Sequence, residues 1–214
     1  MKAYKPEPTF FGEKIILRAI DMQTDPSAYF EMNSDPELHT WTGNSVLPSK
    51  DAAKNELEKY IQNDEILTWI IVDRPTGTLI GRYFIKLIIE DSIRKVGCGS
   101  RIARAYWRKG HNREANRLIF AYIFNVLDAD IIELDAWEEN VNSIQSILSM
   151  GFQCCKKHAA YNAKRDKEMT KLVFSLSKQA WKNRFGTARS MEKEILSGLP
   201  PDGAGSTYTS HDTL

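Results

Sequence analysis

With 214 residues, 42% of them hydrophobic, the chain is long enough for one domain with a substantial core and too apolar to be disordered throughout. Its 29 Lys and Arg residues nearly balance 28 Asp and Glu residues, a net charge of +1, so the overall charge favours no nucleic-acid partner. No apolar stretch approaches the roughly 18 residues of a membrane span, and the N-terminus lacks the apolar run of a secretory signal. We therefore expect a cytoplasmic protein with no nucleic-acid or membrane partner.

The first part of the chain predicts a short strand followed by two helices. Residues 13–20, which are mostly apolar, are expected to form the strand. A helix follows from Asp25 and ends at Asp35-Pro36, because the residue before proline is kept away from helical geometry. Ser49 is the expected N-cap of the second helix. The apolar residues of that helix share one face: Ala53, Leu57, Tyr60 and Ile61.

The middle of the chain predicts a hairpin and a third strand. Residues 68–72 and 79–89 are expected to pair around a turn that contains Gly77. Residues 95–104 form the next strand, which contains two glycines, Gly97 and Gly99. Glycines inside a strand indicate a bulge or a close approach by a ligand or another part of the backbone.

The strongest predicted helix covers residues 111–127, where apolar residues recur at helical spacing. Another helix begins near Asn140 and ends at Gly151. We expect it to carry three side chains inward: Ile144, Ile147 and Leu148. Further strands are expected over residues 131–137, 152–159 and 170–177.

This order mixes hairpins with helical crossovers and predicts an α/β (mixed α+β) fold, with a central mixed, mostly antiparallel sheet flanked by helices. The domain is expected to span residues 1–177. Residues 178–197 are expected to add a helical extension, with apolar residues at Trp181, Phe185, Ala188, Met191 and Ile195. Residues 198–214, rich in Gly, Pro, Ser and Thr, are expected to be a disordered tail.

The three cysteines are Cys98, Cys154 and Cys155. An odd number that includes an adjacent pair suits neither a disulfide framework nor a metal site. We therefore expect structural thiols and no bound metal. The aromatic residues Phe10, Phe11, Trp41, Trp69 and Tyr83 are candidates for shaping a pocket, although core packing is the commoner use of such residues.

Residues 106–115 have the composition of an anion-binding loop between a strand and the strongest helix. The free N–H groups of a helix N-terminus attract anions, and Gly110 leaves room for an anion to approach the backbone. Arg108, Lys109 and Arg113 add positive charge, so a pyrophosphate is the ligand that suits this segment. The competing interpretation is an ordinary basic turn before a helix.

A second polar segment precedes the helix that begins near residue 140. Asn140 and Ser143 lie three residues apart and share one side of the helix start. Taken alone, they are explained by N-capping.

Together, the two segments resemble the GNAT superfamily of acyl-CoA-dependent acetyltransferases. Residues 108–113 look like its Q/R-x-x-G-x-G/A signature, and residues 140–143 with Gly151-Phe152 resemble the Asn-x-x-Ser helix of its RimJ/RimL-type branch. The opening strand of that branch is similar to residues 12–18, and the resemblance covers about residues 10–177.

The resemblance implies acetyl-CoA as co-substrate. Main-chain amides of the loop would hold the pyrophosphate, from Arg108, Lys109, Gly110, His111, Asn112 and Arg113. The strand from Gly99 through Arg101, Ile102 and Ala103 would pair with the pantetheine arm. Asn140 and Ser143 would contact its thiol end. Asn112 departs from the family pattern, which has Gly or Ala at that position, and the His111 side chain matches no family role.

The implied reaction is direct attack by a primary amine, either a protein N-terminus or a small molecule, on the thioester. The usual acid and tyrosine of the family are absent, because their positions hold Gly97 and Ile147. The candidates to replace these catalytic groups are Glu133 and Asp135, which share one side of a strand, together with His39 and Ser143. Solvated carboxylates on a half-exposed strand are the commoner interpretation of Glu133 and Asp135, and a lone histidine is usually incidental.

Two other functions remain open. A catalytically idle acyl-CoA-binding or regulatory module is motivated by the residues at the two usual catalytic positions. A scaffold would use residues 178–214 for partners. We expect the protein to be a monomer or a homodimer. No sequence pattern identifies the amine acceptor.

Overall fold

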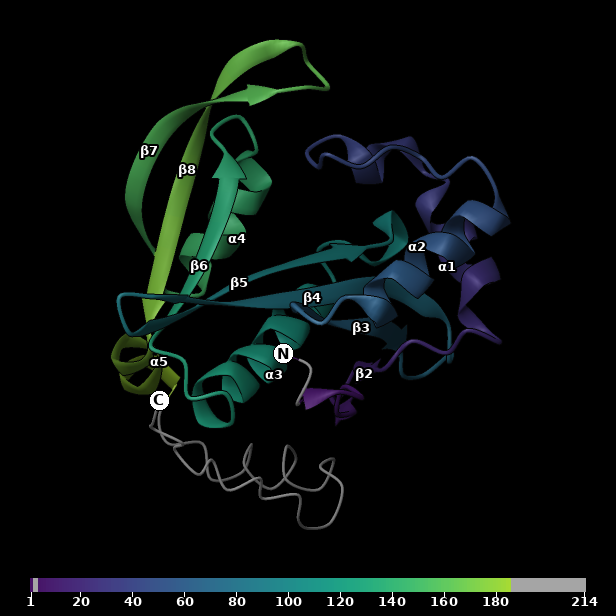
Figure 1. Cartoon of the computed structure of the whole chain (residues 1–214), viewed down its shortest axis with the longest axis horizontal. Helices are drawn as coiled ribbons and strands as arrows, with labels where there is room; N and C mark the ends of the chain where they lie inside the picture. Colours follow the sequence, from purple (N-terminus) through teal and green to yellow (C-terminus); the bar gives the residue numbers. More distant parts are fainter. Residues whose placement is uncertain (2–3, 186–214) are drawn as a thin grey trace, which may run out of the picture.

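The computed structural model describes residues 1 and 4–185, and within them an eight-stranded sheet crosses the molecule in the order β1-β2-β3-β4-β5-β6-β8-β7 (Figure 1). The strands are β1 (Phe10–Phe11), β2 (Ile15–Arg18), β3 (Ile66–Asp73), β4 (Leu79–Glu90), β5 (Ile93–Ile102), β6 (Ile131–Trp137), β7 (Gln153–Asn162) and β8 (Lys167–Ser177). The β5–β6 pair is parallel and the other pairs are antiparallel. The predicted mixed, mostly antiparallel sheet is therefore confirmed.

Helices cover both faces of this sheet. They are α1 (Asp25–Asn33), α2 (Lys50–Gln62), α3 (His111–Asn125), α4 (Val141–Ser149) and α5 (Lys178–Phe185), with short 3-10 turns at Pro36–His39 and Arg104–Tyr106. Adjacent residues of β3 show the two layers, because Ile70 packs with α1 and α2 whereas Ile71 packs in the cluster that contains α3. Among the described residues, no helix is both long and apolar enough to cross a bilayer.

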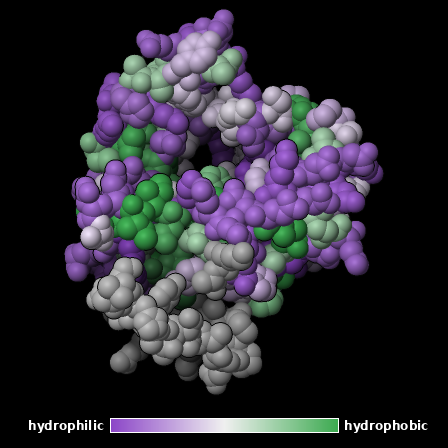
Figure 2. Space-filling model, viewed as in Figure 1, coloured by the Kyte–Doolittle hydropathy of each residue, from purple (hydrophilic) through white to green (hydrophobic). Residues whose placement is uncertain are grey.

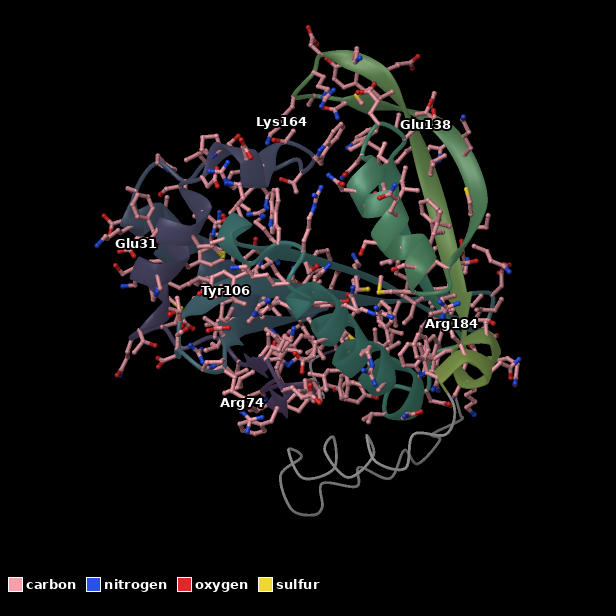
Figure 3. The ribbon with its side chains drawn as sticks, turned by 180° about the vertical axis from the view of Figure 1, so that it is seen from behind. Glu31, Arg74, Tyr106, Glu138, Lys164 and Arg184 are labelled. Carbon is pink, nitrogen blue, oxygen red and sulfur yellow. The ribbon has the colours of Figure 1, made fainter. Side chains whose placement is uncertain are left out.

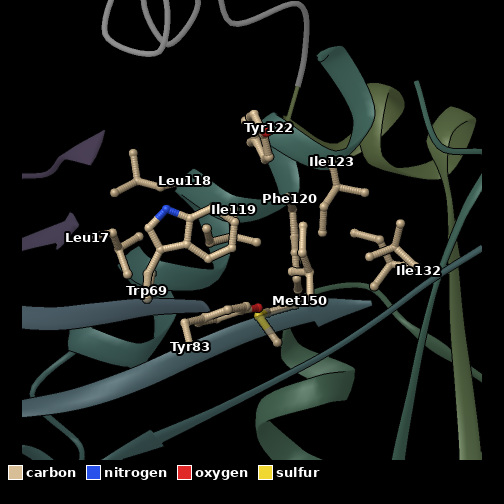
Figure 4. Packing of buried hydrophobic residues seen from close by; sticks show 14 of the residues in the cluster. Leu17, Trp69, Tyr83, Leu118, Ile119, Phe120, Tyr122, Ile123, Ile132 and Met150 are labelled. Atoms are coloured by element: carbon tan, nitrogen blue, oxygen red, sulfur yellow. The ribbon is translucent and has the colours of Figure 1, made fainter. Parts of the chain in front are cut away.

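The larger core lies between α3 and the sheet. Figure 4 shows Trp69 of β3 beneath the apolar side chains of α3, and its ring meets Tyr122 edge-on at 6.0 Å between centroids. The predicted stripe of α3 is buried as expected, at Ala115, Leu118, Ile119, Tyr122 and Ile123. This packing fixes the helix whose N-terminus carries the predicted anion loop.

The helix starts follow the predicted capping chemistry. The Ser49 hydroxyl accepts the Ala52 N–H at 3.1 Å, and the Asn140 carboxamide accepts the Ser143 N–H at 3.2 Å. Asp35 is extended, as predicted for a residue before proline, so α1 has ended before it. A separate 3-10 turn then begins at Pro36, where the Asp35 side chain accepts the Glu37 N–H.

The structure corrects two details. Leu148 is 47% exposed and does not point inward, whereas Ile147 is buried. The β4–β5 register runs unbroken past Gly97 and Gly99, so neither glycine marks a bulge. A close approach explains Gly99, because a Cβ there would lie 2.8 Å from the Phe84 ring.

The C-terminal predictions lie partly outside the described residues. The predicted extension begins as α5, and its Trp181 is buried in the larger core. Residues 186–197 of the predicted extension and the predicted tail at 198–214 lie outside the described part of the chain.

Candidate active site

The two parallel strands at the centre of the sheet separate after a short contact. β5 and β6 pair over three positions, the last being Gly97 with Glu133, whereas β5 stays paired with β4 as far as Ile102. The Ala103 N–H donates to the Ile80 carbonyl on the β4 side. Because main-chain groups alternate along a strand, those of Cys98, Ser100 and Ile102 point away from β4 and into the gap, where the Ile102 carbonyl accepts the Trp107 indole N–H at 2.6 Å. The edge of β5 is thus open from Cys98 as far as the Ile102 N–H.

A cavity of about 1470 Å³ occupies the gap, larger than the roughly 300–1,000 Å³ of an ordinary small-ligand site. Its walls come from residues 37–38 and 40–43, β5 and the loop after it, the start of α3, β6 and α4. Figure 2 shows the hollow between the arm that carries β7 and β8 and the arm that carries α1 and α2. A cavity of this size suits two substrates that meet.

At one end of the cavity, the loop before α3 presents unpaired N–H groups. Arg108 and Gly110 have left-handed backbone angles, with φ of 58° and 89°. Gly110 directly precedes the right-handed first turn of α3, and such a change of hand turns successive N–H groups toward a common point, as in an anion-binding concavity. No side chain caps the first turn of α3, so its N–H groups add to this concavity.

Positive side chains flank that loop. Arg108 and Arg113 line the cavity, and neither forms an ion pair with another described residue. The Lys14 ammonium donates to the Lys109 carbonyl at 2.8 Å and so braces the loop from outside. The site therefore offers main-chain donors and two uncompensated guanidinium groups to an anion.

The side chains of His111 and Asn112, in the same loop, point in different directions. His111 is buried, with Nε2 3.2 Å from Asp73 Oδ1 and its ring edge-on to Tyr106. Its side chain points into the protein, which leaves its main-chain N–H as the group that an anion could reach. Asn112 lies on the cavity wall, with its Oδ1 2.6 Å from the Ser100 hydroxyl.

Asn140 and Ser143 both line the cavity at the start of α4. The capping bond between them occupies the side-chain Oδ1 of Asn140, so the capping interpretation is correct as far as that atom is concerned. The Asn140 amide nitrogen and the Ser143 hydroxyl make no hydrogen bond with another described side chain. Capping therefore does not prevent either residue from contacting a ligand.

The structure divides the catalytic candidates. Asp135 lies on the cavity wall, where its carboxylate pairs with Lys171 at 2.9 Å. Glu133 is half-buried and lies outside the cavity lining. His39 is 3% exposed and its Nε2 lies 2.9 Å from the Asn33 carbonyl. Burial lowers the pKa of His39, which favours a neutral ring with a structural role.

The two positions where the family acid and tyrosine were expected hold no ionisable group. Ile147 is a buried wall residue of the cavity. A Cβ at Gly97 would have no neighbour within 4 Å, so the space that an acidic side chain would need at that position is open. Water rather than protein can occupy that space.

Three residues that sequence reasoning did not connect meet in the cavity wall between α3 and the sheet. The Tyr83 hydroxyl lies 2.8 Å from Asn116 Oδ1 and 3.4 Å from Cys98 Sγ. Burial raises the pKa of the Cys98 thiol to about 12, so the thiol is protonated at neutral pH and is no nucleophile. Asn116 interrupts the apolar face of α3, and a polar residue at such a position is the signal that could have marked it.

The aromatic candidates are also divided. Trp41 and Tyr83 line the cavity, and Phe10 and Trp69 belong to the core. Phe11 is 49% exposed.

A parallel strand pair that splays beside a helix start with uncapped N–H groups is an arrangement that suits an elongated ligand with an anionic end, such as a phosphate-bearing thioester. The sequence pattern of the acetyltransferase (GNAT) domain matches residues 14–153, more than half of the chain. The chain therefore belongs to the GNAT family and is an N-acetyltransferase, with acetyl-CoA as its co-substrate. Membership of this family does not favour the alternative that the protein is a catalytically idle acyl-CoA-binding module.

Solved structures show the same fold. A GCN5-related N-acetyltransferase from Brucella melitensis superimposes with a TM-score of 0.72 at 20% identity, over 92% of this chain and 88% of that one. A GNAT-family acetyltransferase from Bacillus anthracis gives 0.69 at 15% identity, over 80% and 99%. A ribosomal-protein-S5-alanine acetyltransferase from Vibrio fischeri gives 0.69 at 18% identity, over 81% and 98%.

Proposed function

We propose that this enzyme transfers an acetyl group from acetyl-CoA to a primary amine, either a protein N-terminus or a small molecule, by direct attack on the thioester. The observation that carries the proposal is the continuous path along the cavity, from the concavity at residues 108–113 to the open edge of β5. The RimJ/RimL-like motifs and the ribosomal-protein acetyltransferase among the structures of similar fold support a protein N-terminus as one acceptor class.

The residues present fit the co-substrate along that path. The N–H groups of the loop, from Arg108 to Arg113, would hold the pyrophosphate. The N–H and C=O groups of Ser100 and neighbouring residues on the open edge of β5 would pair with the amides of the pantetheine arm. Asn140 and Ser143 would lie at its thiol end.

In the proposed reaction, the amine nitrogen attacks the thioester carbonyl, a C–N bond forms, and the C–S bond breaks. Donors on the cavity wall, including the Ser143 hydroxyl, would stabilise the oxyanion as charge develops. Asp135, a carboxylate on the cavity wall, would accept the proton that the amine loses, directly or through water. The departing sulfur takes up a proton. Holding both substrates in one cavity supplies the remaining rate enhancement.

A substitution in the loop tests the site. A Cβ at Gly110 would meet only Lys14 Nζ, at 3.4 Å, so the obstacle to Gly110→Val is its left-handed φ. We expect this variant to weaken coenzyme A binding by about tenfold or more, or about 1.4 kcal/mol, in calorimetry. Gly77→Val is the matched control, because Gly77 also has a positive φ (69°) but lies in the β3–β4 turn, outside the cavity lining.

The control variant should lose stability without losing affinity. Equal affinities of the two variants for coenzyme A would refute the site. Thiol release from acetyl-CoA over a broad panel of amines tests the reaction itself, and no release with any amine would refute it.

A further inference from the structure

Two arginine side chains are buried next to each other on the face of the sheet that α1 and α2 cover. Arg82 of β4 and Arg101 of β5 are each 8% exposed, and the β4–β5 register places them directly opposite each other. Like charges at directly opposed strand positions repel, and burial strengthens the repulsion. The fold therefore holds two cations where packing alone favours apolar residues.

Neither arginine forms an ion pair within the described part of the chain. The Arg101 Nη1 donates to the neutral Asn33 Oδ1 at 2.6 Å. The Arg82 guanidinium stacks on the Tyr60 ring at 4.3 Å from the centroid. The Nε atoms of both arginines are buried without a hydrogen-bond partner. A buried charge without a counterion lowers the stability of the fold. The two arginines are therefore not explained by a contribution to stability.

The carboxylate whose charge acts on Arg101 is already engaged. Glu56 of α2 accepts the Tyr29 hydroxyl at 2.8 Å and the Tyr60 hydroxyl at 2.6 Å, both on Oε1. It forms no ion pair with either arginine, and its charge acts on Arg101 from a distance. Burial, followed by repulsion from Arg82, lowers the pKa of Arg101.

A further cation approaches from the other arm of the molecule. The Lys164 ammonium, at the tip of the β7–β8 hairpin, donates to the His39 carbonyl, where the hairpin meets the segment after α1 (Figure 3). Burial and repulsion from Arg101 lower the pKa of Lys164. The His39 ring, which its lowered pKa keeps neutral, supplies no negative charge. The region thus carries a net positive charge.

Arg101 brings this charge to the cavity. The charged residues on the cavity wall are Glu37, Arg101, Arg108, Arg113, Asp135 and Lys171. Glu37 pairs with Arg104 at 3.0 Å, and Asp135 pairs with Lys171. Arg108 and Arg113 belong to the proposed pyrophosphate loop. Arg101 is the cavity cation that neither the protein nor the proposed cofactor compensates.

We propose that the acceptor amine carries a carboxylate and that the Arg101 guanidinium binds it, an inference that rests on the proposed function. With Nη1 held by Asn33, the remaining edge of the planar guanidinium consists of Nη2 and the buried, unpartnered Nε, and a carboxylate that reached both atoms would complete the fork. Arg101 is thus a specificity-determining residue for the acceptor, and Arg82 strengthens the positive field behind it.

The first test measures the kcat/KM of the wild-type enzyme for pairs of acceptors that differ only in the carboxylate. We compare ω-amino acids of three to six carbons with the ω-amino alcohols of the same length, and hexapeptides with Glu or Gln at their second position. The carboxylate member of at least one pair should have a kcat/KM about tenfold or more higher, the effect of one charge-assisted hydrogen bond. The pair that shows it identifies a small molecule or a peptide as the source of the carboxylate.

Substitutions at Arg101 test whether this residue causes the preference for carboxylate-bearing acceptors. Arg101→Met should remove it, and Arg101→Lys, which keeps the charge without the fork, should restore part of it. Arg94→Met is the matched control, because Arg94 lies on the same strand, 50% exposed and paired with Asp128 outside the cavity, and it should keep the full preference. Calorimetry with coenzyme A should give the same affinity for all four proteins, because the Arg101 main chain pairs with β4 rather than lining the open edge.

A stability measurement supplies a readout without turnover. Sodium acetate should raise the melting temperature of the wild type more than sodium chloride at equal ionic strength, and this difference should vanish in Arg101→Met. Turnover of both members of every pair at equal kcat/KM, with no acetate effect, overturns this inference and leaves the proposed function standing. Absence of turnover and of coenzyme A binding overturns the proposed function instead.

Discussion

Glu114, in the first turn of α3, fills the space where Gly12 has no side chain. A Cβ on Gly12 would lie 2.8 Å from Glu114 Cδ. The Glu114 carboxylate accepts the main-chain N–H groups of Glu13 and of Lys14, the latter at 3.1 Å on Oε2. This contact ties the turn before β2 to the helix that carries the proposed pyrophosphate loop.

Glu114→Ala should lower the free energy of unfolding by about 1–2 kcal/mol, because two main-chain donors lose a charged acceptor. Urea denaturation measures the change. Glu31→Ala on the exposed face of α1 is the control and should stay within about 0.5 kcal/mol of wild type. If both variants show the same small change, the Glu114 contact contributes nothing to stability.

Asp135→Asn should lower kcat about a hundredfold and leave the KM for acetyl-CoA within about twofold, as expected for loss of a general base. The Asp135–Lys171 pair is exposed at 55% and 28%, so its loss should cost less than about 1 kcal/mol of stability. Glu133→Gln is the matched control, two residues away on the same strand but outside the cavity lining. Steady-state kinetics with a turned-over amine makes the comparison. A full rate in Asp135→Asn would leave water as the proton acceptor.

Asp73, at the end of β3, joins the β3–β4 turn to the start of α3. Its Oδ2 accepts the Thr76 hydroxyl at 2.6 Å and its Oδ1 lies 3.2 Å from His111 Nε2. The Thr76 hydrogen bond, followed by that of His111, lowers the pKa of Asp73 below 3.8. A pKa that is lower in the folded than in the unfolded protein stabilises the fold above the unfolded value, and this stabilisation is lost as pH falls through the folded value.

The stability advantage of wild type over Asp73→Asn should therefore be constant from about pH 7 to about pH 5 and should shrink as the pH is lowered toward about 3. Urea denaturation of both proteins across this range measures it. Thr76→Ala, which removes the largest cause of the shift, should reduce the pH dependence. An advantage that grows on acidification would contradict the assigned direction of the pKa.

Trp181 joins α5 to the main core. It is 5% exposed, and its ring lies 5.8 Å from Phe120 and 5.9 Å from Phe124, both on α3. Trp181→Ala should cost about 3–5 kcal/mol, the usual loss for a large buried aromatic side chain. Lys182→Ala, exposed on the same helix, is the control. A cost of less than about 1 kcal/mol for Trp181→Ala would favour the predicted domain boundary at residue 177 over a boundary beyond α5.

Local patterns predicted most of the secondary structure because they depend on neighbours in the sequence. The stripe of α3 and the caps at Ser49 and Asn140 are of this kind. Leu148 was misplaced because α4 buries a narrow face, on which Ile147 lies, and the width of a buried face depends on what packs against it. Periodicity alone does not report that width.

The sequence by itself determined the family, the sheet class and the loop with its charge, because a motif and a helix start are made by consecutive residues. Tertiary structure alone decided that Arg82 faces Arg101, that Tyr83 meets Cys98 and Asn116, and that His39 is buried and does not line the cavity. These contacts depend on strand register and on the packing of helices against the sheet. Both are set by the free energy of the whole core rather than by any short segment of the chain.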